Sequence, residues 1–256
     1  GCGINPFYGE IDPYYMAGNC IEECIRNIVS CGGNPDRIAI LDNFCWGNVN
    51  EEKELGNLVR CVKGCKDFAL KYKVPYISGK DSLNNYFRGK DGKIISIPGT
   101  LLISGIGIIE DVRKITSTDF KRSENLIFIL GKTYNELGGS QFYRIHNIKE
   151  GLVPKPNPEK TLNLMRKLHY AIKNGIIKSC HDCSDGGLIT TICEMMIGGN
   201  LGCEINFSDV IAEEKDPEVI LFSESCGRFV VEIEKEKVKE FEDIFKNEEF
   251  GQIGKV

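Results

Sequence analysis

Residues 16–43, MAGNCIEECIRNIVSCGGNPDRIAILDN, contain the succession of elements that decides the fold class. Apolar side chains recur three or four residues apart over 16–29, which predicts a helix with one apolar stripe. The glycines of CGGNPD end that helix, and the apolar run in RIAILDN predicts a short buried strand. Similar helix and strand patterns continue along the chain, so we predict an α+β or mixed α/β protein with two domains.

The rest of the first half predicts one more helix and three strands. The helix covers 51–71, and the strand PYIS leads into a glycine turn, GKDSLNN, before strands around KIISI and TLLISGIGII. We predict that the polar segment 116–123 connects a first domain, 1–115, to a second, 124–256. In the second domain, predicted helices alternate with strands. These helices follow ELGGS and cover 159–173, 188–196 and KEKVKEFEDIF.

The composition is that of a globular protein. The 256 residues include 32 basic and 37 acidic side chains, which give a net charge of −5, and 41% are hydrophobic. This mild acidity argues against a nucleic-acid partner, which normally requires a basic face. No stretch approaches 18 uninterrupted apolar residues, and GCGINPFYGE has no signal-peptide pattern, so we expect no membrane partner. Because Gly1 is not a natural start, we expect a piece of a longer polypeptide.

Twelve cysteines first suggest disulfides or a metal site. Cys20 and Cys24, like Cys61 and Cys65, stand four residues apart in apolar helical patterns, where cysteine acts as a small buried hydrophobe. A chain of this length needs no disulfide staples, so we expect reduced thiols and a cytoplasmic location. Only CHDC at 180–183 has metal-like spacing, and the sequence lacks the second ligand pair of a structural zinc site.

The segment SGKDSLNN, residues 78–85, is a first candidate binding loop. Glycine after a strand lets the backbone approach a ligand closely, while Lys80 could pair a phosphate and Asp81 could hold Mg²⁺. The upstream glycine and the GK[ST] order of a Walker A loop are absent. A binding loop and an ordinary polar surface turn are equally supported by these residues alone.

The segment HDCSDGG, residues 181–187, is the stronger candidate. Asp182 and Asp185 could share a metal, and Gly186 and Gly187 open a helix N-terminus suited to phosphate. An aspartate N-cap would need only one of these residues. We therefore favour a binding site here.

Two further patterns have simple structural explanations. Asp42 and Asn43 end a predicted strand, where ligand sites of α/β proteins gather, but on these residues alone we prefer an Asx turn beside a buried tryptophan. Glu23 and Asn27, four residues apart on the first helix, could coordinate Mg²⁺, but most such pairs are only solvated. There is no GxSxG elbow, so the residues alone predict no more than binding of a Mg²⁺–phosphate species.

Taken together, these segments resemble phosphoribosylformylglycinamidine synthase, an enzyme of purine biosynthesis. The resemblance is carried, in the family's order, by NPFYGEIDPYYMA with EECIRNIVSCGG, AILDNFCWGN, SGKDSLNN, HDCSDGGL and LFSESCGRFVVEI. It implies that 1–115 is part of an aminoimidazole-ribonucleotide-synthetase-like (AIR-synthetase-like) N-terminal domain without its opening strands. It also implies that 124–256 is the corresponding C-terminal α/β domain.

The resemblance implies a site for ATP and for the substrate, formylglycinamide ribonucleotide. Asp42, Gly79 and Lys80 match ATP-site positions, and Ser82 matches a serine that contacts the substrate. Because a lysine ammonium cannot ligate Mg²⁺, Lys80 would pair a phosphate instead.

The resemblance also implies an auxiliary nucleotide site that does not hydrolyse its ligand. Glu23, Asn27 and Asp182 match its magnesium ligands, and Ser184 lies on the nucleotide side. The implied cofactors are Mg²⁺ and ATP or ADP. The family resemblance therefore favours metal binding by Glu23 and Asn27, whereas their spacing alone favours a solvated pair.

The implied reaction converts formylglycinamide ribonucleotide and ammonia from glutamine into formylglycinamidine ribonucleotide. ATP phosphorylates the amide oxygen, and ammonia then displaces phosphate from the iminophosphate. The expected partners are the N-terminal half of the synthetase and a glutaminase. Missing opening strands would expose sheet edges, so a homo-oligomer is a further expectation. We expect the fragment alone to be inactive, and the alternative is a non-catalytic nucleotide-binding or scaffold module.

Overall fold

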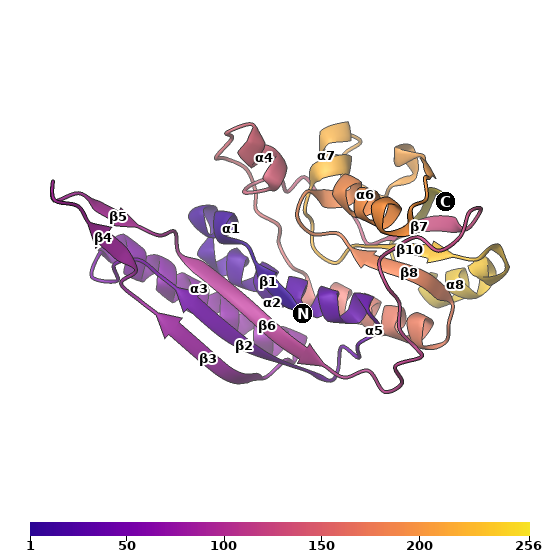
Figure 1. Ribbon diagram of the computed structural model, residues 1–256, viewed down its shortest axis with the longest axis horizontal. Helices are drawn as coiled ribbons and strands as arrows, with labels where there is room; N and C mark the ends of the chain where they lie inside the picture. The colour runs from indigo at the N-terminus through magenta and orange to yellow at the C-terminus, as the bar shows by residue number, and fades with distance from the viewer.

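The computed structural model describes residues 1–256, and its first half is a sheet covered on one face by two long helices (Figure 1). The elements of this half are β1 (Cys2–Ile4), α1 (Pro6–Ile11), α2 (Pro13–Ser30), β2 (Ile38–Cys45), α3 (Glu52–Tyr72), β3 (Tyr76–Ser82), β4 (Tyr86–Arg88), β5 (Ile94–Ser96) and β6 (Thr100–Gly107). The strand order is β1-β6-β2-β3, with β2 and β3 parallel and the other pairs antiparallel. Strands β4 and β5 form a separate hairpin that projects from one end.

The second half is a five-stranded antiparallel sheet with helices on both faces. Its elements are β7 (Leu126–Leu130), α4 (Gln141–Ile145), α5 (Pro158–Lys173), β8 (Ile177–Asp182), α6 (Gly187–Gly199), β9 (Glu204–Ile205), α7 (Pro217–Phe222), β10 (Phe229–Ile233), α8 (Val238–Phe245) and β11 (Phe250–Lys255). The strand order is β8-β10-β7-β11-β9. This arrangement confirms the predicted mixed helix and strand content. None of the helices has the length and apolar character needed to cross a membrane.

Local sequence signals explain where the long helices begin and end. The Asp12 carboxylate caps α2 by accepting a hydrogen bond of 2.9 Å from the Tyr14 amide, and Pro13 supplies a backbone angle suited to the first turn. Helix α3 ends at Tyr72, and its C-cap residue Lys73 takes the left-handed conformation. The following Val74–Pro75 pair cannot continue a helix, because proline restricts the residue before it.

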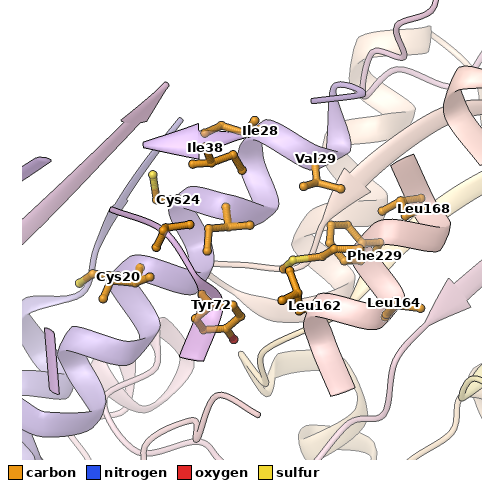
Figure 2. Packing of buried hydrophobic residues seen from close by; sticks show 14 of the residues in the cluster. Cys20, Cys24, Ile28, Val29, Ile38, Tyr72, Leu162, Leu164, Leu168 and Phe229 are labelled. Atoms are coloured by element: carbon orange, nitrogen blue, oxygen red, sulfur yellow. The ribbon is translucent and has the colours of Figure 1, made fainter. Parts of the chain in front are cut away.

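One hydrophobic core joins the two halves. Its 38 buried residues include side chains of α2 and α3 and side chains of α5, β8 and β10. Figure 2 shows Val29 and Tyr72 beside Leu162 and Phe229 in this cluster. The Tyr72 hydroxyl also hydrogen-bonds Thr161 Oγ1 at 2.9 Å. A second core of 11 residues lies on the α6 side of the second sheet.

Several elements differ from the sequence prediction. Residues 79–82, predicted as a turn, continue strand β3, because parallel pairing with β2 keeps them extended. The predicted strand end at Asp42 and Asn43 is wrong for the same reason, since β2 runs on to Cys45. The acidic linker after β9 contains the short helix α7, and the unpredicted helix α1 precedes α2.

Candidate functional site

The eight residues singled out in the sequence fall into two groups. We call Glu23, Asn27, Asp182 and Ser184 the cleft cluster, and Asp42, Gly79, Lys80 and Ser82 the strand-edge cluster. Members of the first group come from both halves of the chain, whereas all members of the second come from β2 and β3. No hydrogen bond or ion pair directly joins a residue of one cluster to a residue of the other.

The cleft cluster forms where α2 meets the loop after β8. Asn27 Nδ2 donates to Asp182 Oδ2 at 3.2 Å across 155 positions of sequence, and the Ser184 hydroxyl donates to the same carboxylate oxygen. The HDCSDGG loop thus presents Asp182 and Ser184 directly to the flank of α2. The four residues that the family resemblance implied for one site are brought together.

Arg26 organises this cluster, although its sequence position gave no reason to select it. Its guanidinium donates to Ser184 Oγ at 3.0 Å, and its Nε lies 3.5 Å from Asp182 Oδ2. A third contact is a buried ion pair with Glu22, whose other oxygen accepts from the Gly227 amide at 3.0 Å. Burial disfavours the Asp182 carboxylate, but the His181 ring, with Nδ1 3.4 Å from Asp182 Oδ1, and the charge of Arg26 prevail and lower its pKa to about 2. Asp182 is therefore ionised at neutral pH.

Glu23 has the opposite character. Its Oε2 accepts hydrogen bonds from Asn5 Nδ2 at 2.6 Å and from the Ile4 amide at 3.2 Å. Burial, together with the nearby Asp185 and Asp182 carboxylates, raises its pKa to about 8. Glu23 is thus mostly protonated at pH 7, and it would lose that proton when a cation binds beside it.

The donor chemistry of the cleft cluster fits Mg²⁺, which prefers carboxylate and amide oxygens. Glu23, Asn27 and Asp182 provide two carboxylates and one amide. The space beside Glu23 and Ser184 is small, 10 Å³, which suits one water or ion, so a nucleotide would have to lie outside this space. No three or more His, Cys, Asp or Glu side chains are grouped to hold a metal, so Asn27 or non-protein ligands would have to complete the coordination.

Glu224 is a further residue that sequence reasoning missed. Its carboxylate accepts from the Gly186 amide at 2.8 Å and the Gln141 amide at 2.9 Å, and from the Tyr8 hydroxyl. It therefore occupies the helix N-terminus at Gly186–Gly187 that we expected to receive phosphate. The sequence contains one signal for Glu224: it lies between two serines of LFSESC, in a segment that carries the family resemblance.

The strand-edge cluster is divided between the two faces of the first sheet. Asp42 and Gly79 are register partners on the face that carries α3, and a Cβ atom at position 79 would lie only 2.2 Å from Asp42 Oδ1. Burial and the nearby Asp81 carboxylate raise the pKa of Asp42. Gly79 is therefore required for Asp42 to keep its position.

Lys80 and Ser82 lie on the opposite face of the sheet, because successive side chains of a strand alternate. Lys80 pairs in register with Asn43, and Ser82 with Cys45. Strand β3 pairs only with β2, so its other edge is open, and a ligand lying along that edge could reach both faces.

The remaining histidines and cysteines form no further cluster of metal-ligating groups. All twelve cysteines are unpaired. His181 Nε2 lies 2.8 Å from Glu194 Oε2, and His169 Nδ1 lies 3.1 Å from the Gly32 carbonyl. His146 is exposed at the end of α4.

Comparison with known families defines the class of protein. Residues 2–108 match the AIR synthase related protein, N-terminal domain, and residues 122–256 match the AIR synthase related protein, C-terminal domain. The chain therefore belongs to the family of AIR synthase related proteins. The predicted AIR-synthetase-like architecture is confirmed.

Within this family, the chain is similar to phosphoribosylformylglycinamidine synthase subunits. It is 34% identical to subunit PurL of Thermococcus sibiricus over 253 residues, which are 98% of this chain and 34% of the relative. All of the chain aligns with 41% of T. maritima PurL complexed with FGAR, at 17% identity and a TM-score of 0.79. It also aligns with 40% of T. maritima PurL complexed with ATP, at 18% identity and a TM-score of 0.74. The chain thus spans about a third of the length of the curated relatives it matches.

Proposed function

We propose that this chain is the C-terminal part of an ATP-dependent phosphoribosylformylglycinamidine synthase of purine biosynthesis. One observation carries the proposal: Asp42, Gly79, Lys80 and Ser82 lie together on the paired strands β2 and β3, and the outer edge of β3 is open to a ligand. The 34% identity to PurL over almost the whole chain points the same way. The complexes of T. maritima PurL with FGAR and ATP support formylglycinamide ribonucleotide and ATP as ligands.

In this proposal the strand-edge cluster serves the reaction. Lys80 pairs a phosphate of ATP as a point charge, and Ser82 donates a hydrogen bond to the ribonucleotide. The substrate amide oxygen is phosphorylated, and ammonia displaces phosphate from the resulting iminophosphate. The chain contributes chiefly by positioning the two substrates and balancing their charge.

The partner in this proposal is the N-terminal half of the synthetase, with a glutaminase as the source of ammonia. The face of the first sheet opposite α2 and α3 contains Ile4 and Ile106, which are 44% and 65% exposed. Both point to the same side as their register partners Leu102 and Ala39. An apolar sheet face of this kind is typical of a surface that another domain covers.

The test is turnover by the assembled synthase with formylglycinamide ribonucleotide, ATP and ammonia. We expect Ser82→Ala to raise the KM for the ribonucleotide by about tenfold, the effect of losing one hydrogen bond to a charged ligand. The exposed Ser208→Ala, in the second half of the chain, serves as the matched control. Unchanged kinetics in both Ser82→Ala and Asp42→Ala enzymes would refute the assignment of the strand-edge cluster.

The alternative is a nucleotide-binding or scaffold module that performs no chemistry. It is favoured by the fact that the cleft cluster is assembled within this chain alone. Here Glu23, Asn27 and Asp182 would hold Mg²⁺, and Ser184 would contact the nucleotide. Titration calorimetry with Mg²⁺ and ADP should then show binding without hydrolysis that is lost in Asp182→Ala. Turnover by the assembled synthase that depends on Ser82 would decide against this alternative.

A further inference from the structure

The turn after β3 is tied to the end of β2 by the side chain of Asn85. Its Nδ2 donates to the Ser82 carbonyl at 2.6 Å and to the Trp46 carbonyl at 3.2 Å. The backbone amide of Asn85 donates to the same Trp46 carbonyl at 2.9 Å, and the Trp46 amide donates to the Ser82 carbonyl at 2.8 Å. Ser82, Trp46 and Asn85 therefore form a closed set of hydrogen bonds.

The Trp46 end of this set is anchored in the core. The Trp46 side chain is 1% exposed, and its Nε1 donates to the Glu54 carbonyl on α3 at 3.0 Å. The neighbouring Gly47 carbonyl accepts from the Asn84 amide at 2.8 Å. Asn84 has a φ of 63°, a left-handed conformation that asparagine adopts more readily than most residues. Contacts to buried groups thus fix the shape of the turn.

The amide of Asn85 also reaches the Ser82 hydroxyl. Asn85 Nδ2 lies 3.2 Å from Ser82 Oγ, and Asn85 Oδ1 lies 3.3 Å from the same atom. An amide offers donors and an acceptor, and a hydroxyl can both donate and accept. The Ser82 hydroxyl can therefore donate to Oδ1 when no ligand is bound and accept from Nδ2 when its proton goes to a ligand. Its oxygen keeps one position in both states.

We propose that Asn85 is a positioning residue that holds the Ser82 hydroxyl ready to donate to the ribonucleotide. The inference rests on the proposed function, because it takes Ser82 to contact formylglycinamide ribonucleotide. Asn85 does not touch the substrate and acts only through Ser82. A serine side chain has three staggered rotamers, so a hydroxyl held in one of them binds up to about threefold more tightly than a free one.

The first test replaces the amide with a carboxylate, which accepts hydrogen bonds but does not donate them. In Asn85→Asp a charge-assisted hydrogen bond keeps the Ser82 proton from the substrate. The assembled synthase should then show a KM for the ribonucleotide raised by about tenfold, as in Ser82→Ala. Asn85→Ala leaves the hydroxyl free and should raise this KM by only about threefold. A purely structural role predicts the reverse order, because aspartate has nearly the shape of asparagine.

The second test removes the hydroxyl through which Asn85 acts. In the Ser82→Ala background, Asn85→Asp should raise the KM for the ribonucleotide by less than about twofold more, since both substitutions remove the same interaction. The KM for ATP should be unchanged in all these enzymes. Asn57→Asp is the matched control, because Asn57 is half-buried like Asn85 but lies on α3. It should leave both KM values unchanged.

The outcomes separate the inference from the proposed function. An Asn85→Asp effect of equal size with and without the Ser82 hydroxyl, or a parallel rise in the KM for ATP, would overturn the inference. A raised KM in Ser82→Ala with wild-type kinetics in both Asn85 variants would overturn the inference and leave the proposed function intact. Wild-type kinetics in Ser82→Ala would refute both. If Asn85→Asp does not fold, Asn85→Ala in the same two backgrounds decides the question.

Discussion

Glu23 is a carboxylate that the fold keeps protonated near neutral pH. Its pKa rises from the ordinary 4.5 to about 8 on folding. Between these values the native protein keeps a proton that the unfolded chain has lost, so native stability falls as the pH rises. Glu23→Gln removes this loss, and we expect it to stabilise the metal-free protein by about 1–3 kcal/mol at pH 7.5 and much less at pH 5. Urea unfolding at the two pH values measures the difference.

The control for this experiment is Glu10→Gln, which changes an exposed carboxylate on α1. It should have the same effect on stability at both pH values. A Glu23→Gln effect that is also independent of pH would contradict the raised pKa. If Mg²⁺ binds at Glu23, the same substitution should weaken that binding, so stability and binding should change in opposite directions.

Gly79 is the residue whose missing side chain makes space for Asp42. Gly79→Ala would place a Cβ 2.2 Å from Asp42 Oδ1. A carboxylate can rotate away, so we expect a loss of stability of only about 1 kcal/mol but a clear rise in the KM for ATP. Gly56→Ala, on α3 with nothing within 4 Å of its added Cβ, should leave the KM unchanged and stabilise the helix by about 0.5–1 kcal/mol. An unchanged KM in Gly79→Ala would show that the position of Asp42 is not critical.

At the scale of elements, the N-cap of α2 supports the cleft cluster from a distance. Asp12→Ala should destabilise the protein by about 1–2 kcal/mol, because Asp12 caps the helix that carries Glu23 and Asn27. Asp12 also pairs with Arg60 at 2.7 Å in an exposed ion pair, which is worth less than about 1 kcal/mol. Thermal unfolding of Asp12→Ala and Arg60→Ala distinguishes the two contributions. Equal losses would assign the effect to the ion pair and contradict the capping role.

The elements also show what the sequence can and cannot predict. Helices α2, α3 and α5 were predicted to within a few residues, because apolar periodicity and end signals agree. Strand β3 beyond Ser78 was missed because GKDS has no alternating pattern, and only its pairing with β2 keeps it extended. Helices α1 and α7 were not predicted, because each has only six residues and begins at a proline, which in a sequence is typical of a turn.

The members of the candidate site stay predictions from the sequence, and their arrangement could not be predicted. Family resemblance, and not residue spacing, selected Glu23 and Asn27, and the structure brings Asn27 into contact with Asp182. Arg26 and Glu224 were missed because their roles depend on contacts that are distant in sequence, 158 positions for Arg26 with Ser184 and 216 positions for Glu224 with Tyr8. The division of the strand-edge cluster between two faces followed from the unpredicted length of β3.

At the scale of the whole molecule, the uncovered face of the first sheet predicts association. Ile106→Lys would place a charge at the 65% exposed end of this face without entering the core, so folding should be preserved. We expect co-purification with the N-terminal half of the synthetase to fall by tenfold or more, because an interface does not tolerate an unpaired buried charge. Exposed Ile197→Lys, on α6 in the second half, is the control. Intact co-purification of the Ile106→Lys protein would exclude this face as the contact surface.

The shared core has a consequence for how such a chain can be inherited. Its 38 residues cross from α2 and α3 into α5 and β10 (Figure 2), so each half alone would expose apolar surface that the other half covers. The connection between residues 108 and 125 is free of helices and has no strand longer than a single bridge. A recombination breakpoint there would nevertheless separate two pieces of one folding unit. Gene duplication and exchange would have to carry both halves together.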